Sequence, residues 1–319
     1  MIRIGVVTSG GDAPGMNAAI RAVVRRGIYL GIEIFGIQRG FLGLVNGEII
    51  KMNLGSVADI IHRGGTILHT ARCDEFKTEE GQIKALRNLE EYNIDGLVVV
   101  GGDGSIRGAY ELGNKGFPVI AVPGTIDNDV PCTDYSIGFD TAVNTVIEVI
   151  NKVRDTATSH ERTFIVEVMG KNSGWIALEA GLAGGAESIL VPEIQYDIEQ
   201  VCNKLIRGHK RGKLHSIIIV AEGSGKGFEI GEAVKAKTGF ETRVTVLGHI
   251  QRGGVPTAKD RIIASLLGAE AVNLLVQGKE NIMVGIKGRE VNFTDLDRII
   301  NEKKEFDFKI YQLADSLSI

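Results

Sequence analysis

The sequence has only three cysteines, and their spacing does not indicate a common disulfide or metal site. Cys73, Cys132 and Cys202 lie far apart and form no C-x-x-C pair, which argues against a disulfide framework or a thiolate zinc site. The chain also lacks any apolar run of about 18 residues, the length needed to cross a bilayer. Gly-Gly-Asp at 10–12 interrupts the start before a signal peptide could form. We therefore expect a cytoplasmic protein with reduced thiols and no membrane span.

An excess of positive charge is missing as well. The chain carries 36 basic and 40 acidic residues, a net charge of -4, so no global field attracts nucleic acid or an anionic membrane. We expect no partner of either kind, and any anion site must be local. The sequence shows no internal repeat or polar linker. Its 319 residues, of which 44% are hydrophobic, can bury one large or two medium cores.

Two common nucleotide-binding patterns are absent. Neither the P-loop G-x-x-x-x-G-K-[ST] nor G-x-G-x-x-G occurs. The segment GSGKG at 223–227 follows an apolar run, but its spacing fits neither pattern, and we interpret it as a flexible loop. A nucleotide site, if there is one, must be built differently.

Short β-branched apolar runs alternate with segments of helical periodicity. Helical spacing is found over 16–28 and 143–153, and the expected strands are 2–7, 94–100, 119–122, 163–168, 188–191, 216–221 and 244–248. Strands that are apolar on both faces and alternate with helices predict parallel sheets covered by helices, the α/β class.

Ligands of such sheets bind beyond the carboxyl ends of the strands, and three polar, glycine-rich loops follow expected strands. They are TSGGDAPG at 8–15, GGDGS at 101–105 and PGTIDND at 123–129. The first opens helix 16–28, where free backbone N–H groups and the helix dipole favour a phosphate. Taken alone, a Gly-Gly after a strand is more often just a tight turn.

The other two loops carry acids. Asp103 stands between glycines, where one carboxylate together with substrate phosphates is a sufficient protein contribution to a Mg²⁺ site. A plain turn is the alternative, and lipid kinases and nicotinamide-dinucleotide kinases have similar loops. Asp127 and Asp129 lie two residues apart, so their repulsion needs relief, and one of them can serve as a base toward a hydroxyl. Asx-turn capping is the alternative for Asp129.

Beyond these loops, GGTIL-x-TAR at 64–72, IGFDTA at 137–142, ATSHER at 157–162, VEVMG at 166–170 and LGHIQRGG at 247–254 follow in order. With them the chain resembles the bacterial ATP-dependent 6-phosphofructokinases from residue 2 to about residue 275. The resemblance implies two Rossmann-like three-layer α/β/α domains with mainly parallel sheets and an active site in the cleft between them. ATP would bind residues 1–138 and 251–301, and fructose 6-phosphate would bind residues 139–250 and 302–319.

The resemblance also implies roles for single residues. Asp127 would be the base that deprotonates the 1-hydroxyl of fructose 6-phosphate, and Asp103 would hold Mg²⁺. Thr125, Arg72 and Lys171 join Asp127 as catalytic candidates. The ATP site would consist of Gly11, Arg72, Cys73, Gly102, Asp103, Gly104 and Ser105. The sugar-phosphate site would consist of Thr125, Ile126, Asp127, Arg162, Met169, Gly170, Lys171, Glu222, Arg243, His249, Ile250, Gln251 and Arg252.

Two of these arginines imply an oligomer. Arg162 and Arg243 would reach the 6-phosphate from a neighbouring subunit, so the resemblance implies a homotetramer with shared active sites. Arginine binds phosphate through two parallel hydrogen bonds, although surface solvation is the alternative. The family usually has arginine at position 171, where Lys171 keeps the charge but loses that geometry. His249 could otherwise be a satisfied core histidine, but its glycine-rich polar surroundings favour substrate binding.

An effector pocket is the last feature that the resemblance implies. Arg21 and Arg25 lie one turn apart on a predicted helix, an arrangement that an anion would relieve, whereas a solvated helix face is the alternative. The expected pocket consists of Arg21, Arg25, Arg154, Gly185, Glu187, Arg211, Lys213 and His215. In the family, ADP activates and phosphoenolpyruvate inhibits.

The phosphoryl donor can be inferred from two glycines. Pyrophosphate-using relatives carry Asp at the position of Gly104 and Lys at that of Gly124, and the glycines here leave room for the α-phosphate of ATP. The alternatives are a pyrophosphate-dependent enzyme, a GGDG-type lipid or dinucleotide kinase, and a catalytically silent metabolite sensor on the same fold.

Overall fold

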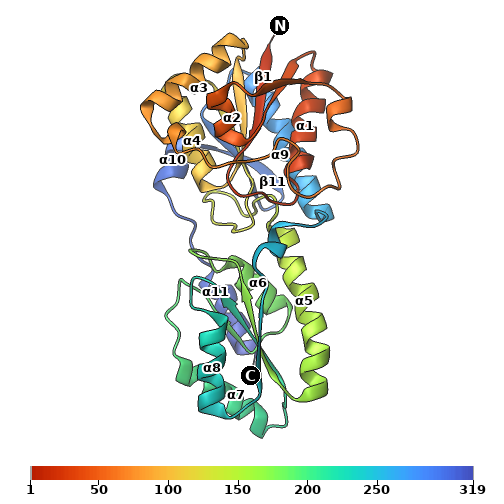
Figure 1. Ribbon diagram of the computed structural model, residues 1–319, viewed down its shortest axis with the longest axis vertical. Helices are drawn as coiled ribbons and strands as arrows, with labels where there is room; N and C mark the ends of the chain where they lie inside the picture. Colours follow the sequence, from red (N-terminus) through yellow and green to blue (C-terminus); the bar gives the residue numbers. More distant parts are fainter. Residues whose placement is uncertain (1, 319) are drawn as a thin grey trace. The chain divides into compact units, whose positions relative to one another are not determined.

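The computed structural model describes residues 2–318, which form two compact units (Figure 1). Unit 1 comprises residues 1–141 and 252–304, and unit 2 comprises residues 142–251 and 305–319, the terminal residues 1 and 319 lying outside the described part. The predicted ATP and sugar-phosphate domains, with borders at 138/139, 250/251 and 301/302, stay a prediction.

Unit 1 is built on a seven-stranded sheet in the order β11-β10-β5-β4-β1-β2-β3. Its strands are β1 (Arg3–Thr8), β2 (Glu33–Ile37), β3 (Ile49–Met52), β4 (Gly96–Gly101), β5 (Val119–Pro123), β10 (Ile282–Lys287) and β11 (Glu290–Asp295). The five central strands are parallel, and only the edge strands β3 and β11 are antiparallel.

Helices cover the sheet of unit 1. They are α1 (Met16–Tyr29), α2 (Gly40–Asn46), α3 (Glu79–Glu91), α4 (Asp103–Asn114), α9 (Ala258–Val276) and α10 (Leu296–Asn301), with 3₁₀ turns at Gly55–Val57 and Glu75–Lys77. Helix α1 packs on α9, while α2 packs on α3 and α4 on α10 (Figure 1). Each strand of the β1–β4–β5 centre is almost wholly buried, which explains the unbroken apolar runs in the sequence.

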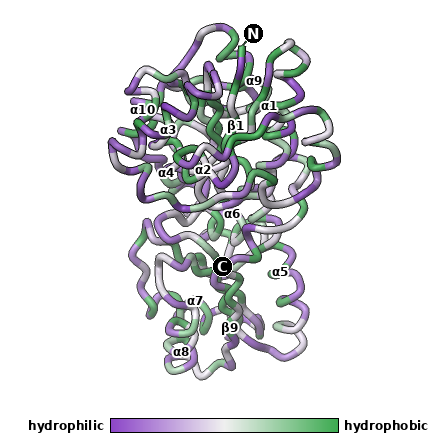
Figure 2. The backbone as a smooth tube through the Cα atoms, turned by 45° about the horizontal axis from the view of Figure 1, so that its top comes forward, coloured by the Kyte–Doolittle hydropathy of each residue, from purple (hydrophilic) through white to green (hydrophobic). Residues whose placement is uncertain are grey.

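Unit 2 has a four-stranded, all-parallel sheet in the order β7-β8-β6-β9. Its elements are α5 (Phe139–His160), which begins in unit 1, β6 (Thr163–Val168), α6 (Trp175–Ala183), β7 (Ser188–Leu190), α7 (Ile198–Lys210), β8 (Ser216–Ala221), α8 (Gly227–Thr238), β9 (Thr242–Val246) and α11 (Phe308–Leu317), with a 3₁₀ turn at Gly248–Arg252. Hydrophobic stretches run through the inside of each unit, and hydrophilic ones prevail in the outer loops (Figure 2).

The expected α/β class with mainly parallel sheets is confirmed, with one strand displaced. The strand expected at 244–248 lies at Thr242–Val246, and a 3₁₀ turn occupies the end of the expected range. Strand β9 forms the edge of its sheet and leaves Arg243 exposed, so apolarity was a poor guide there. The edge strands β3 and β11 were missed for the same reason, because their faces are partly polar.

Two findings concern the absences noted in the sequence. Within residues 2–318, Cys73, Cys132 and Cys202 are all free thiols. No helix in that same range is long and apolar enough to cross a membrane.

Candidate functional site

The three glycine-rich loops leave the sheet of unit 1 side by side. Strand β1 pairs with β4, so that Thr8 lies beside Val100, and β4 pairs with β5, so that Val100 lies beside Val122. The loops that follow are therefore brought together at the carboxyl edge of the sheet. A parallel sheet binds its ligands at this edge.

The first loop turns sharply into α1. Gly10 and Gly15 have φ values of 83° and 104°, a backbone region that favours glycine, and Gly15 is the N-cap of the 14-residue helix. Gly11 is exposed, and a side chain there would collide with the guanidinium of Arg252. Arg252 also donates a hydrogen bond of 3.3 Å to the carbonyl oxygen of Asp12, so the guanidinium lies directly over the loop.

The second loop is shorter than the sequence suggested, because Asp103 is already the first residue of α4 and Gly102 is its N-cap. The first N–H groups of a helix have no partner within it, and they lie at the positive end of the dipole. Asp103 and Gly104 are exposed, whereas Ser105 is buried. The start of α4 thus offers backbone donors beside one exposed carboxylate.

The third loop is held by its own polar side chains. Thr125 is 7% exposed, and its Oγ1 accepts a hydrogen bond of 3.2 Å from the backbone N–H of Asp127. Ser136 donates from Oγ to the Thr125 carbonyl at 2.7 Å, and Asn128 accepts from the Ser136 N–H at 2.9 Å. These bonds fix the backbone on both sides of Asp127, so its carboxylate is carried by a preorganised turn.

A cavity of about 460 Å³ unites these loops. It is lined by Ser9, Gly10, Gly11, Phe41, Ala71, Arg72, Cys73, Asp74, Phe76, Lys77, Gly102, Asp103, Gly104, Ser105, Thr125, Asp127, Asp129 and Arg252. Every residue predicted for the ATP site lies in this lining. So do three residues predicted for the sugar phosphate: Thr125, Asp127 and Arg252.

An aromatic pair forms an apolar wall that the sequence did not reveal. Phe41 and Phe76 stack with ring centroids 4.1 Å apart and an angle of 9° between their planes, and both line the cavity. They come from α2 and a 3₁₀ turn, 35 positions apart in the chain. No local pattern links the two positions, so only the fold could identify them.

Asp129 was weighed as a turn-capping residue, yet it lines the cavity. Burial raises the pKa of its carboxyl to about 6, the negative charges of Asp127 and Asp103 act in the same direction, and a backbone hydrogen bond and Lys304 oppose the rise. The carboxylates therefore crowd one another in the protein alone. Such a crowd is typical of a site that receives positive charge with its ligand.

The raised pKa of Asp129 predicts how stability changes with pH. Between pH 3.8 and about 6 the folded protein holds a proton that the unfolded chain has lost. The free energy of unfolding should thus fall as pH rises through this window, by on the order of 3 kcal/mol. Asp129→Asn should remove this dependence in urea unfolding followed by circular dichroism. Asp155→Asn, at an exposed carboxylate of α5, should keep it, and an unchanged slope in Asp129→Asn would contradict the assignment.

Other residues predicted for the sugar phosphate lie in unit 2, around the carboxyl end of β6. The Met169 N–H donates to Oε1 of the fully buried Gln251 at 3.2 Å, and Gln251 donates to the Gly248 carbonyl at 3.0 Å. Gly170 accepts from the Gly223 N–H at 3.1 Å, which ties the end of β6 to the turn after β8, where Glu222 lies. Lys171, His249 and Ile250 are exposed. The alternative that His249 is a core histidine is therefore wrong. Ile126, which was also predicted for the sugar-phosphate site, belongs to unit 1 and is buried.

Arg162 and Arg243 share one carboxylate. The Nε of Arg162 lies 2.9 Å from Oε1 of Glu241, and the Nη2 of Arg243 lies 2.6 Å from the same oxygen. Their guanidinium groups therefore lie close together at the end of the sheet where β6 and β9 begin. The two arginines were predicted to bind the same 6-phosphate, and in the structure both lie beside Glu241.

Six of the residues predicted for the effector pocket lie in unit 2, and four of them make two direct contacts. Arg154 donates to the Gly184 carbonyl and, at 3.4 Å, to that of Gly185. Lys213 pairs with the buried Glu187. Arg211 is exposed and His215 half-buried. Arg21 and Arg25 lie in unit 1 on α1, where Arg25 is exposed and Arg21 partly so.

The side chains available as metal ligands limit how a metal ion could be bound. Among residues 2–318 no cluster of three or more His, Cys, Asp or Glu side chains is arranged to hold a metal ion. The acids of the cavity fit Mg²⁺ only as partners of a phosphate-bound ion, since Mg²⁺ takes one or two carboxylates and completes its shell with phosphates and water. Crowding of Asp127 and Asp103 around Asp129 is in keeping with such a cation.

Comparison with known sequences shows the family of the chain. The family model described as Phosphofructokinase matches residues 3–275. Proteins named ATP-dependent 6-phosphofructokinase are 59% identical in Halalkalibacterium halodurans, 60% in Natranaerobius thermophilus and 60% in Bacillus subtilis, each over 319 residues and 100% of both chains.

Solved structures of phosphofructokinases share the fold of the chain. Phosphofructokinase from Saccharomyces cerevisiae aligns with a TM-score of 0.88 and 35% identity over 94% of this chain and 45% of the yeast chain. Pichia pastoris phosphofructokinase in the T-state aligns with a TM-score of 0.89 and 37% identity over 99% of this chain and 39% of the Pichia chain. A pyrophosphate-dependent phosphofructokinase from Marinobacter aquaeolei shares the fold, with a TM-score of 0.85. It is 23% identical, and the alignment covers 97% of this chain and 86% of the other. On the extent of these matches, the chain belongs to the phosphofructokinase family.

Proposed function

We propose that the chain is an ATP-dependent 6-phosphofructokinase of glycolysis. It transfers the γ-phosphoryl group of ATP to the 1-hydroxyl of D-fructose 6-phosphate, giving fructose 1,6-bisphosphate and ADP. The observation that carries the proposal is the cavity of unit 1, where the start of α4 and the carboxylates of Asp103 and Asp127 line the same space. Phosphoryl transfer asks a protein mainly for alignment and charge neutralisation.

Asp127 is the base in this proposal. Its backbone is fixed through Thr125, and its carboxylate lines the cavity. It accepts the proton of the sugar hydroxyl as the oxygen attacks the γ-phosphorus, and ADP leaves with the bridging oxygen. Thr125 keeps the turn in place, and Lys171, in unit 2, supplies positive charge to the transferred group.

Cationic and backbone groups bind the nucleotide phosphates. The first N–H groups of α4 face the cavity edge, and Gly11 leaves room for close approach, while Arg72 and Arg252 supply positive charge. Phe41 and Phe76 form an apolar wall that suits an adenine base. Asp103 would hold Mg²⁺ together with the phosphates, and the ion would neutralise charge that develops on them.

A coupled assay with fructose 6-phosphate and either ATP or pyrophosphate tests the proposal. A side chain at Gly104 would meet no atom within 4 Å, whereas a Cβ at Gly124 would lie 3.1 Å from Val100 and 3.4 Å from Met16. Gly104 thus keeps space free beside Asp103, which favours the longer donor, and Gly124 lies where a larger residue would be crowded. We expect turnover with ATP and none with pyrophosphate. Turnover with pyrophosphate alone would identify the other donor class, and no turnover with either would favour a silent sensor.

The finer parts of the proposal follow the family. The enzyme works in the cytoplasm as a homotetramer in which Arg162 and Arg243 of one subunit complete the sugar-phosphate site of the next. ADP activates and phosphoenolpyruvate inhibits through the effector residues. The pairing of Arg162 and Arg243 around Glu241 supports the first point, because it presents two guanidinium groups jointly. Differential affinity for two tetramer states is what the control by effectors requires.

Arg162→Ala should therefore raise the KM for fructose 6-phosphate at least tenfold, since a hydrogen bond to a charged group contributes about 1.5–3 kcal/mol. The KM for ATP should change little. Steady-state kinetics with each substrate varied in turn measures both. Arg207→Ala, at an exposed arginine of α7, is the matched control, and equal effects on both KM values would contradict the assignment.

Asn17 is expected to act through the segment 63–73, which carries Arg72 and Cys73. Its Nδ2 donates to the carbonyls of Arg63 and Gly64, both at 3.1 Å, and its Oδ1 accepts from the Ile67 N–H at 2.7 Å. Asn17→Asp removes two donors without changing shape, so the KM for ATP should rise roughly tenfold.

Asn88→Asp is the control for this substitution. Asn88 also donates from Nδ2 to two carbonyls, at 2.8 and 2.9 Å, but these belong to the end of α2. The two variants should lose similar stability, and only Asn17→Asp should raise the KM for ATP. An equal rise in the KM for ATP in both variants would mean that Asn17 has only a structural role.

A further inference from the structure

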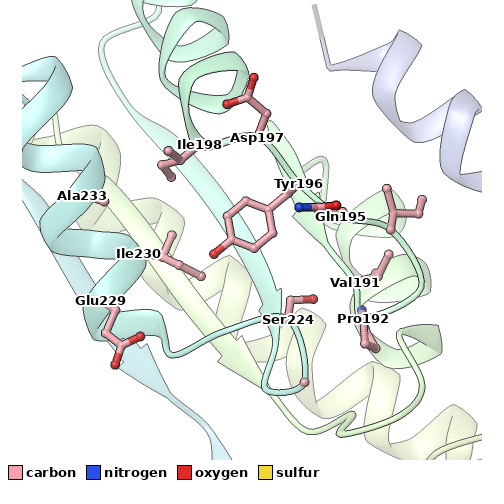
Figure 3. Close-up of a pocket in the computed structure, with 12 residues that line it drawn as sticks. Val191, Pro192, Gln195, Tyr196, Asp197, Ile198, Ser224, Glu229, Ile230 and Ala233 are labelled. Atoms are coloured by element: carbon pink, nitrogen blue, oxygen red, sulfur yellow. The ribbon is translucent and has the colours of Figure 1, made fainter.

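Unit 2 contains a cavity of about 740 Å³ that is larger than the cavity around Asp103 and Asp127 (Figure 3). It lies beyond the carboxyl ends of the neighbouring parallel strands β7 and β8, between the segment 191–198 and the start of α8. Its lining consists of Val191, Pro192, Ile194, Gln195, Tyr196, Asp197, Ile198, Gly223, Ser224, Glu229, Ile230 and Ala233. Both its place and its size are typical of small-molecule sites.

The walls of this cavity are largely apolar. Ile230 is buried, and Tyr196 and Ile198 pack against the core cluster of unit 2. In Figure 3 the ring of Tyr196 extends from the segment 191–198 across the cavity toward α8. An occupant would therefore meet aliphatic side chains and an aromatic face.

Several polar side chains in this lining have no hydrogen-bond partner. The Oγ of Ser224 is buried without one. Within residues 2–318 the side chains of Gln195, Tyr196 and Glu229 also make no hydrogen bond or ion pair. Asp197 uses Oδ1 to cap α7, accepting from Glu199 at 2.8 Å. Gln195, Asp197 and Glu229 are exposed at the edge of the cavity, with Asp197 and Glu229 on opposite sides of the Tyr196 ring (Figure 3). A few polar groups in the lining of a cavity are the usual means of orienting a ligand.

The charged side chains that line the cavity indicate the charge of the ligand that it can bind. Asp197 and Glu229 are acidic, and no Lys, Arg or His is among the described residues that line the cavity. A phosphate ester or carboxylate would meet two negative charges there. An amine would meet a carboxylate on either side of the Tyr196 ring, and the face of that ring attracts cations (Figure 3).

The cavity touches the turn that follows Glu222. Gly223 lines the cavity and donates its N–H to the Gly170 carbonyl at 3.1 Å, and a side chain at Gly223 would collide with the Lys171 backbone. The GSGKG segment, interpreted from the sequence as a flexible loop, is therefore packed at its first residue against the end of β6. A ligand that shifts this turn shifts the backbone of predicted sugar-phosphate residues.

We propose that this cavity binds a small organic amine and that its occupancy changes the affinity of unit 2 for the sugar phosphate. The apolar chain of the amine lies against Ile198, Ile230 and Tyr196, and its cationic group pairs with Glu229. The coupling between amine binding and sugar-phosphate affinity acts through Gly223, and this part of the inference rests on the proposed function. Binding of the amine is independent of the proposed function.

Calorimetry on the full chain at 0.15 M salt, with agmatine and spermidine as probes and succinate as the anionic control, tests the binding. At least one amine should bind and succinate should not. Ala233→Phe should abolish binding by filling the cavity, and Glu229→Gln should weaken it about fivefold, the effect of a partly exposed ion pair. The controls Ala236→Phe and Glu232→Gln, on the same helix outside the lining, should bind like the unchanged chain.

The outcomes separate this inference from the proposed function. Failure of both amines to bind, or equal binding by Ala233→Phe, overturns the site whether or not the chain is a kinase. If binding holds, saturating amine should change the KM for fructose 6-phosphate at least twofold and leave the KM for ATP unchanged, an effect absent in Ala233→Phe. Binding without that change overturns the coupling. Absence of kinase activity in the unliganded chain counts against the proposed function alone.

Discussion

Replacing Asp127 with asparagine is expected to lower kcat by about 10²–10⁴-fold, the contribution of a positioned general base. The amide cannot accept the proton of the sugar hydroxyl, yet it keeps the shape of the side chain and leaves the turn formed with Thr125 intact. The affinity for ATP should change little, because in the proposed function the phosphates are bound chiefly by α4 and the arginines. Steady-state kinetics and a nucleotide-binding titration together check both expectations.

Asp74→Asn is the matched control for this prediction. Asp74 lines the same cavity, but it is exposed and paired with Lys77 at 2.6 Å. Its loss should leave kcat within a small factor of the unchanged enzyme. Similar losses in the two variants would mean that the charge of the cavity, and not a base at position 127, is what matters.

Asp103→Asn is expected to lower kcat/KM for ATP by roughly 10²–10³-fold, the range seen when one electrostatic contact of a transition state is removed. Asp103 presents an exposed carboxylate at the first turn of α4. The variant should also need more Mg²⁺ for half-maximal activity, because an amide is a poorer ligand than a carboxylate.

A Mg²⁺ titration of activity at fixed ATP separates this role from a structural one. Glu111→Gln changes an acid of the same helix away from its N-terminus and should leave the Mg²⁺ requirement unchanged. An Asp103→Asn enzyme that loses activity with an unaltered Mg²⁺ requirement would contradict the proposed metal contact.

Much of the fold could be predicted because the buried strands carry a strong signal. Strands β4 and β5 are buried along their whole length, and their apolar runs stand out in the sequence. Strands β2 and β10 were missed although they lie inside the sheet. Strand β9, at an edge with exposed positions, was displaced by two residues, and the edge strands β3 and β11 were not predicted. Edge strands alternate in polarity and depend on their neighbours, which a single sequence does not show.

The candidate site divides in the same way. Gly11, Asp103 and Asp127 could be identified because loops at the ends of neighbouring parallel strands must converge. The resemblance supplied Arg72 and Arg252, and the structure brings both to the same cavity. Phe41, Phe76 and Asn17 could not be identified, since their contacts join positions far apart in the chain. Long-range packing of this kind leaves no local pattern.

The central claim is transfer of the γ-phosphoryl group to one hydroxyl of the sugar. The most direct measurement incubates the chain with fructose 6-phosphate and ATP labelled in the γ-phosphate, and then locates the label in the product by NMR. We predict that it appears on carbon 1 of fructose 1,6-bisphosphate, in step with ADP formation. Label released as inorganic phosphate, or found on another hydroxyl, would contradict the account.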